Sequence, residues 1–304
     1  MPNFGEYTNV SDVRSTYIKQ TGTGDDVLML DLIREVSRMM DSSAKTVYYP
    51  FIQTRNYDIP RFNVSPWSNL YAIPYDVFPY TAHVGGAYQS YLTFDLYLLD
   101  LLTLTNGEGT TIASSKYYLY PSNYYPKRGV RLKPTSGTVW LPATTGEWEQ
   151  VIQVQGVWGY HEDYTNAWVD TAATLSAAIT TTSATTFTCT TGKIKAGQLL
   201  KIDSEYFYAS AVTTGASDTI TVVRGANGST AATHLISTAI SYWQVDYSIQ
   251  SLCRMATAAM YRLRDNPVGD TVVYEGRVFQ TPKDIQKFID DRIDALGASR
   301  VVFA

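Results

Sequence analysis

The chain has 304 residues, of which 45% are hydrophobic and 17% charged, and its formal net charge is −4 at pH 7. This length leaves room for two domains with cores of their own. The small negative charge argues against a dedicated nucleic-acid binder, although DNA could still pass such a protein without adhering to it. No apolar run approaches the roughly 20 residues of a membrane helix, and no signal peptide is expected at the N-terminus.

Two helices are predicted near the N-terminus. Ser11 can cap a short helix over 11–19. A longer helix is predicted over 25–41, where Asp25 and Asp26 suit the positive N-terminal end of the helix dipole. Its apolar side chains recur with the helical period: Met29, Leu32, Ile33, Val36 and Met40.

From Thr46 the pattern becomes extended, and a small antiparallel sheet is expected within 46–160. Asn106-Gly107 is a strong hairpin-turn signal between two apolar runs. Residues 61–90 interrupt the strands with a stretch rich in Pro, Gly, Tyr and Asn, which predicts a long loop or arm.

Tyrosine is unusually frequent, with 24 residues that are concentrated in the first half of the chain. Tyrosine suits both protein–protein contacts and strands, so both interpretations stay open. Three adjacent pairs cannot all face inward on strands: Tyr48/Tyr49, Tyr117/Tyr118 and Tyr124/Tyr125.

Residues 169–242 differ from the chain on either side, because they are rich in Thr, Ser and Ala and poor in charged residues. Short strand-like pieces alternate there with turns that contain Gly, Asn and Ser. This pattern predicts an inserted all-β domain, either an Ig-like sandwich or a small barrel.

Helical periodicity returns after the insert, over 247–264 and over 282–296. Pro282 suits the first position of the second of these helices, with Thr281 as its N-cap. The prediction is an α+β fold in which a helical bundle with a small antiparallel sheet forms one body. That body comprises 1–168 and 243–304.

Residues with catalytic or ligand chemistry are sparse. The three histidines, His83, His161 and His234, lack metal-ligand spacing with a cysteine or with one another. His161, Glu162 and Asp163 are consecutive, but a polar triplet after a glycine-rich turn is more typical of a solvated loop. The motifs of hydrolase nucleophiles, phosphate-binding loops and dinucleotide sites are missing. We therefore expect a non-enzyme with no catalytic residue, no metal and no cofactor.

Cysteine usage gives a further expectation about assembly. Cys189 and Cys253 lie in segments of opposite character and do not have the spacing of a metal site. A reduced protein assembled in a cytoplasm is favoured over a disulfide-bonded one.

One basic cluster stands out on strand-like chain: Lys127, Arg128, Arg131 and Lys133. On a strand, residues 127, 131 and 133 share one face, so a positive stripe could touch DNA phosphate or an acidic neighbour. Ordinary surface charges of a strand are the alternative and the simpler interpretation.

Four motifs outside the insert follow one another along the chain: "IREVSRMMD" at 33–41, "TRNYD" at 54–58, "VQGVWGY" at 154–160 and "TAAMYRLRDNP" at 257–267. In this order they resemble the head–tail connector, or adaptor, proteins of tailed bacteriophages. The resemblance covers roughly residues 1–60, 91–165 and 245–297, which is most of the chain outside the insert.

The resemblance implies a virion structural protein that forms a homo-oligomeric ring, typically of twelve subunits, under the portal at the neck. Such a ring extends the DNA channel used in genome packaging and ejection, carries DNA only as passing cargo and offers a surface to tail, stopper or nozzle proteins. It would be assembled in the host cytoplasm without a membrane. By position, the portal-docking tail would be Arg300, Val301, Val302 and Phe303. The intersubunit arm would be Trp67, Tyr71, Tyr75, Phe78 and Tyr80.

The insert is similar to small β modules that recur in phage structural proteins. In this sequence the recognisable residues are Glu205, Arg224, Gly225 and Gly228. Gly225 and Gly228 suit turns, and Arg224 is expected to pair with a carboxylate such as Glu205 in a structural rather than a binding role. The insert would face outward from the ring, where it could meet tail fibres.

Two other functions stay open at this stage. The chain could be a tail or baseplate protein whose insert binds a fibre or carbohydrate, and glycan binding by the insert alone would favour this reading. A hydrolase with an accessory β module is disfavoured, because no nucleophile and base stand out together.

Overall fold

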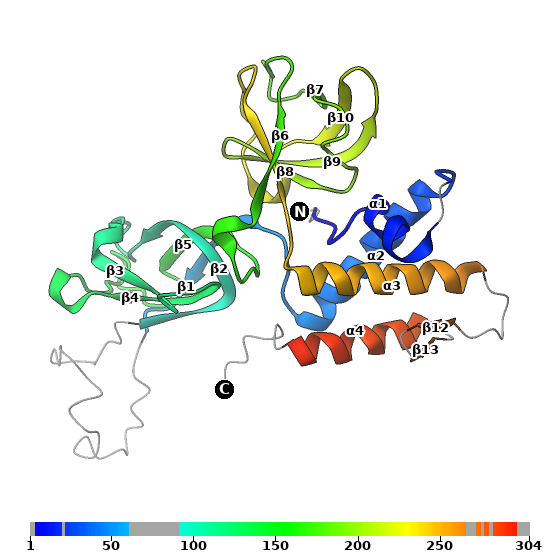
Figure 1. Cartoon of the computed structure of the whole chain (residues 1–304). Coiled ribbons are helices and arrows are strands. Elements are labelled where there is room, and N and C mark those ends of the chain that lie inside the picture. The colour runs from blue at the N-terminus through cyan, green and yellow to red at the C-terminus, as the bar shows by residue number, and fades with distance from the viewer. Residues whose placement is uncertain are drawn as a thin grey trace. The chain divides into compact units, whose positions relative to one another are not determined.

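The structure is a computed structural model. It describes residues 4–19, 22–60, 91–265, 272–274, 277–279 and 282–296. Among these residues, four α-helices occur with two larger antiparallel sheets, so the fold is α+β (Figure 1). Contacts divide the chain into two compact units. The first consists mainly of Met1–Phe51 and Gly159–Val302, and the second mainly of Ile52–Trp158.

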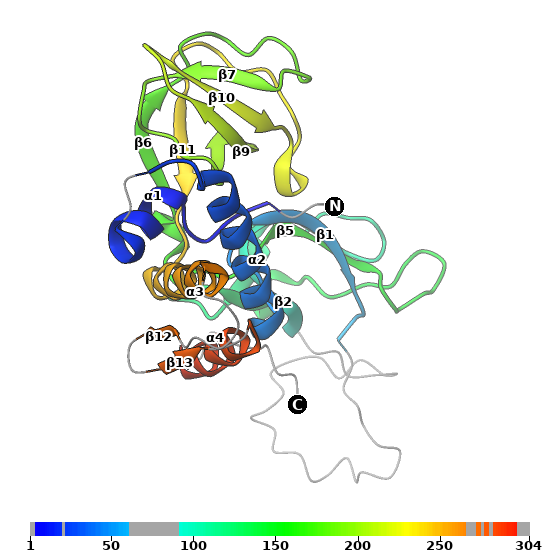
Figure 2. The same cartoon turned by 90° about the vertical axis from the view of Figure 1, so that its right-hand side faces the viewer.

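The helices of the first unit come from both ends of the chain and pack against one another (Figure 2). They are α1 (Val10–Val13), α2 (Asp26–Ala44), α3 (Tyr247–Asp265) and α4 (Pro282–Leu296). α2 contacts both α3 and α4, and α3 contacts α4. The apolar stripes that the sequence predicts supply the buried side chains of this bundle: Met29, Ile33, Val36, Met40, Leu252, Ala256, Ile285 and Ile289.

The predicted helices are confirmed with small changes at their ends. The first continues from α1 into a single π-helical turn, Arg14–Ile18. Its N-cap is Asn9 rather than Ser11, because the side-chain oxygen of Asn9 accepts a hydrogen bond from the backbone N–H of Asp12 at 3.0 Å. The Ser11 hydroxyl donates to that same oxygen instead. Pro282 begins α4 as expected, and Thr281 lies outside the described residues.

The insert forms a six-stranded antiparallel sheet in the order β6-β11-β8-β9-β10-β7. An isolated bridge between Leu175 and Cys189 and a hydrogen bond from Ser176 N to Thr188 O connect the two edge strands. The sheet therefore closes on itself, and of the two predicted forms the barrel is the one observed. Its strands are β6 (Trp168–Thr174), β7 (Thr186–Cys189), β8 (Leu199–Ile202), β9 (Glu205–Thr213), β10 (Asp218–Val223) and β11 (Ala239–Trp243).

The barrel core is apolar and continuous across all six strands. Phe207 is fully buried in this core, with its ring 5.9 Å from that of Phe187 and at nearly a right angle to it. Aliphatic side chains fill most of the remaining space around these two rings. The other members include Ala173, Leu200, Ile202, Ala209, Ile220, Val222 and Ile240.

The N-terminal segment Phe4–Thr8, here called the N-terminal strap, lies between the barrel and α2. Phe4 exchanges hydrogen bonds with the side chain of Asn227, from Phe4 N to Oδ1 at 2.9 Å and from Nδ2 to Phe4 O at 2.6 Å. Asn227 Nδ2 also donates to Pro50 O at 3.0 Å. The Phe4 ring stacks on that of Tyr208 on β9, with centroids 4.8 Å apart. One segment thus holds the barrel and the helices together.

A second group of contacts along the strap involves charged side chains. The Tyr208 hydroxyl donates to Glu6 Oε1 at 2.7 Å, and Arg34 Nε on α2 donates to the same oxygen at 3.1 Å. Arg38 donates to the carbonyl of Gly5 at 2.8 Å. At the C-terminal end of β11, Trp243 Nε1 donates to Tyr48 O at 2.8 Å. Because of these contacts, the helices share a compact unit with the barrel, which differs from the expected grouping of helices with the sheet.

The second unit is built on a five-stranded sheet in the order β1-β5-β2-β4-β3. Phe94 and Trp158 are buried in its core with their rings 5.5 Å apart, edge to face. The strands are β1 (Phe51–Tyr57), β2 (Tyr91–Thr105), β3 (Tyr117–Tyr120), β4 (Lys127–Leu132) and β5 (Ile152–Trp158).

The predicted turn at Asn106-Gly107 reverses the chain, but over a longer path than a two-residue hairpin. Asn106 N donates to Thr110 O at 2.8 Å, and Thr105 then bridges Thr111. The Asn106 side chain also donates to Val139 O and accepts from Leu141 N, so it anchors a second loop of the sheet unit.

Candidate functional site

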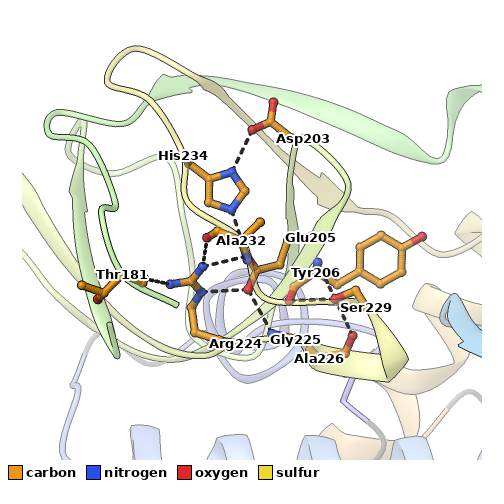
Figure 3. Close-up of polar contacts among 10 residues, drawn as sticks. All are labelled: Thr181, Asp203, Glu205, Tyr206, Arg224, Gly225, Ala226, Ser229, Ala232 and His234. Carbon is orange, nitrogen blue, oxygen red and sulfur yellow. Dashed lines mark hydrogen bonds and ion pairs between the residues drawn. The ribbon is translucent and has the colours of Figure 1, made fainter. Parts of the chain in front are cut away.

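A buried network of charged side chains lies within the barrel (Figure 3). Glu205, the first residue of β9, is fully buried, and Arg224 directly after β10 reaches it with two parallel hydrogen bonds of 2.7 Å each. The backbone N–H groups of Gly225 and Ala232 donate to the same carboxylate at 3.0 and 2.8 Å. His234 Nε2 lies 2.9 Å from Glu205 Oε2. The predicted Arg224–Glu205 pair is therefore formed.

These donors decide the charge of Glu205. Burial alone would raise the pKa of this carboxyl, but hydrogen bonds from Arg224, His234 and the two backbone amides hold the pKa of Glu205 below its ordinary value. Arg224 is in turn satisfied by the carbonyl of Thr181 at 2.9 Å and by that of Ala232. A buried ion pair is favourable only when its remaining hydrogen-bonding atoms are satisfied in this way.

His234 extends the network toward the surface. Its Nδ1 lies 2.8 Å from Oδ2 of Asp203, whose side chain is exposed. Because ionised carboxylates only accept hydrogen bonds, both contacts of the ring are satisfied when both ring nitrogens carry protons. The network thus connects three loops of the barrel and has the geometry of a structural clamp.

The turn after Arg224 needs unusual backbone conformations. Gly225 and Gly228 have φ of +58° and +83°, in the left-handed region that glycine adopts without steric cost. Asn227 between them also has a positive φ, of +51°, and asparagine is one of the few other residues that tolerate it. This agrees with the turn role that the sequence predicts for both glycines.

The predicted basic stripe is only partly available at the surface of the sheet unit. Lys127 is buried, and its Nζ donates to the carbonyls of Pro121, Ser122 and Tyr124 at 2.8, 3.1 and 2.9 Å. Desolvation lowers the pKa of this ammonium. Lys127 therefore stabilises its own loop. The prediction that it contributes to a contact with DNA or an acidic partner is wrong, because its ammonium group is buried.

The other three basic residues lie beside tyrosine rings. Lys133 Nζ is 4.4 Å from the centroid of the Tyr118 ring, and the Arg128 guanidinium is 5.2 Å from that of Tyr97. Arg131 is the cross-strand partner of Tyr118 in the β3–β4 ladder. Cation–π contacts of this kind keep the charge while they order the side chain.

The tyrosine pairs show how the same residue type divides between interior and surface. Tyr48 and Tyr49 are both buried, which is possible because they precede β1 and are not on a strand. Tyr118 and Tyr124 are 51% and 67% exposed, whereas Tyr117 and Tyr125 are only partly exposed. Exposed Tyr118 and the nearby Lys116 were not among the site residues predicted from the sequence, although the "KYY" run at 116–118 carries the signal.

The triplet His161, Glu162 and Asp163 divides between the interior and the surface. His161 is buried, with Nε2 2.9 Å from the carbonyl of Gln244 and Nδ1 accepting from the backbone N–H of Asp163 at 3.0 Å. Both ring nitrogens are therefore occupied by backbone contacts, and only the two acidic residues lie in a solvated loop as predicted.

Within the described residues, no group of three or more His, Cys, Asp or Glu side chains could hold a metal ion. No helix of this part of the chain is sufficiently long and apolar to cross a membrane. Cys189 and Cys253 are free thiols in buried positions, where desolvation raises the pKa of each to about 11 and about 12 respectively.

Two sets of predicted residues cannot be placed. The proposed portal-docking tail, 300–303, and the proposed intersubunit arm within 61–90 lie outside the described residues. Their roles stay predictions from the sequence.

Comparison of the chain with models of protein families, with curated proteins and with solved structures gave no match.

Proposed function

We propose that this protein is a virion structural protein without catalytic activity, a head–tail adaptor that forms a ring under the portal of a tailed bacteriophage. The observation that carries the proposal is the ordered set of motifs outside the insert, at 33–41, 54–58, 154–160 and 257–267. The ring would extend the DNA channel and offer a surface to the tail or its stopper.

The architecture supports this proposal in two respects. The helices from the two chain ends pack together, as expected for an adaptor bundle whose sheet and insert are carried between them. The barrel is fixed to those helices through the strap contacts of Phe4 and Glu6, so every subunit of a ring would carry it in a defined position relative to the bundle.

Negative-stain electron microscopy of the purified full-length chain tests the proposal. Closed rings of one symmetry, with twelve-fold as the expectation, are the predicted result. A chain that stays monomeric at high concentration, both alone and with the portal protein, would contradict it.

A second function deserves a test because of one apolar feature of the barrel. Leu235 and Ile236 are 77% and 59% exposed at a turn that Thr238 fixes by donating from its hydroxyl to Leu235 O at 2.8 Å. Two exposed aliphatic side chains on a rigid turn favour attachment of a protein such as a tail fibre over carbohydrate. Trimers in place of rings in the microscope would support a tail or baseplate protein of this kind.

A further inference from the structure

One face of the β3–β4 strand pair gathers cations and tyrosines. The ladder places Tyr118 opposite Arg131 and Tyr91 on β2 beside Arg131 on the other side. Lys133 N donates to Lys116 O at 2.9 Å, so these two lysines continue the same ladder by one further pair. Because directly paired residues of a ladder share a face, Tyr91, Tyr118 and Arg131 project from one face of the sheet. The Lys133 ammonium lies over the Tyr118 ring on that face, and Lys116 ends the 3-10 turn directly before β3 and is exposed. We call this set, Tyr91, Lys116, Tyr118, Arg131 and Lys133, the basic aromatic face.

The arrangement has a local electrostatic cost. Lys116 and Lys133 are like charges in directly opposed positions, which destabilises a strand pair, and Arg131 lies one position along the same face. Lys116 is exposed, and the Lys133 ammonium lies over the Tyr118 ring. β3 is an edge strand of its sheet, so the basic aromatic face includes the edge of the sheet. A negatively charged partner would offset this repulsion.

The residue types point to a protein partner. Tyrosine and arginine are enriched in the energetically dominant positions of protein interfaces. Tyr118 is half exposed, and its ring already orders the lysine that would accompany it into a contact, which lowers the entropy lost on binding.

We propose that the basic aromatic face docks on an acidic surface of a second copy of this chain and so forms part of the contact between neighbouring subunits. This inference rests on the proposed ring. A contact between two different surfaces is heterologous, and heterologous contacts are the ones that close into rings.

Charge favours a second copy over DNA as the occupant. The chain has 28 acidic against 24 basic residues and a sequence pI of about 5.4, so a second copy carries acidic groups in excess. The same excess repels a nucleic acid, and the three cations of the face, Lys116, Arg131 and Lys133, are few for contacts with phosphate.

The double variant Lys116→Glu/Lys133→Glu tests the proposal in the full-length chain. Sedimentation velocity over a range of protein concentrations is expected to show self-association weakened by about tenfold or more. The matched control is Lys193→Glu/Lys195→Glu, which makes the same change in net charge at two exposed lysines of the barrel and should assemble like the parent chain. Circular dichroism checks that each variant is folded, and Tyr118→Ala gives a second, uncharged variant with the same expected weakening.

The possible outcomes separate the two proposals. Assembly that survives both Lys116→Glu/Lys133→Glu and Tyr118→Ala overturns the docking face and leaves the ring proposal standing. A parent chain that does not self-associate overturns both. If the parent chain binds a duplex DNA oligonucleotide, and Lys116→Glu/Lys133→Glu abolishes that binding without affecting assembly, the face contacts nucleic acid and the inference is wrong.

Discussion

At the scale of single residues, the barrel depends on a carboxylate that is buried and ionised. Glu205 accepts from a guanidinium, an imidazole and two backbone amides, and all of them lie in loops that follow or precede barrel strands. Loss of its charge would leave Arg224 buried opposite a neutral group. Removing one partner of a buried ion pair destabilises the folded state by much more free energy than the intact pair contributes to folding. The reason is that the remaining charge is buried without a partner.

The variant Glu205→Gln is therefore expected to lower the free energy of unfolding by roughly 3–5 kcal/mol. Urea unfolding followed by tryptophan fluorescence measures this difference. The control is Glu149→Gln, which makes the same chemical change at an exposed position. Equal stabilities of the two variants would show that the network is not the clamp described above.

A second buried carboxyl predicts a dependence of stability on pH. Burial raises the pKa of Asp41 to about 7, although Arg38 at 3.2 Å and the Tyr7 hydroxyl both lower it. The pKa of this carboxyl in the unfolded chain is near 3.8, so the folded state binds the extra proton between these two values. The stability that Asp41 contributes is fully present below about pH 4 and is lost as the pH rises through about 7.

Replacement Asp41→Asn removes this titration. The decline in unfolding free energy between about pH 4 and about pH 7 should be smaller in the variant than in the parent chain. Urea unfolding at a series of pH values gives both curves. A decline of the same size in both would mean that Asp41 ionises normally in the fold.

At the scale of elements, the N-terminal strap connects parts of the chain that are far apart in sequence. Its hydrogen bonds to Asn227 and its contacts with Arg34 and Tyr208 bring together α2, β9 and the turn after β10. Gly5 fits there because a Cβ would lie 2.8 Å from Cβ of Tyr49. The strap therefore connects the barrel to α2 through both backbone and side-chain contacts.

The variant Asn227→Asp tests this role with almost no change in shape. The carboxylate cannot donate to Phe4 O or Pro50 O, so a destabilisation of roughly 1–3 kcal/mol is expected. Hydrogen exchange should become faster in Phe4–Thr8, whereas Asn56→Asp at an exposed position of β1 should leave it unchanged. Unaltered exchange in the strap would contradict the assignment.

The elements were more predictable from the sequence than the contacts between them. Periodicity identified α2, α3 and α4, and alternation with turn residues identified β7 to β10, because these patterns are local. The sequence does not predict β6 and β11, since Trp168 and Trp243 lie at the two ends of the insert and no turn signal brackets them. The pairing of Arg224 with Glu205 was foreseen from residue type, but His234 and Asp203 join it through the closure of the barrel, which no local pattern encodes. Likewise, the sequence predicts Lys127 as a surface charge, because the loop carbonyls that bind its ammonium group are brought to it by the fold.

At the scale of the whole molecule, the chain forms two compact units, one with helices and barrel and one with the five-stranded sheet. Each unit carries one feature relevant to the proposed assembly. The first has the barrel, which the strap connects to α2, and the second has the basic aromatic face at a sheet edge. Because every copy carries a net charge of −4, the proposed contact between copies would depend on such a local positive surface. Higher salt should weaken that contact, because exposed charges are screened.

The central proposal, a ring that attaches to a portal, is tested most directly by electron microscopy of the full-length chain mixed with a portal protein encoded in the same genome. We expect added density with closed rotational symmetry on one end of the portal, and loss of that density when residues 298–304 are deleted. A portal that remains bare in the presence of excess full-length chain would contradict it.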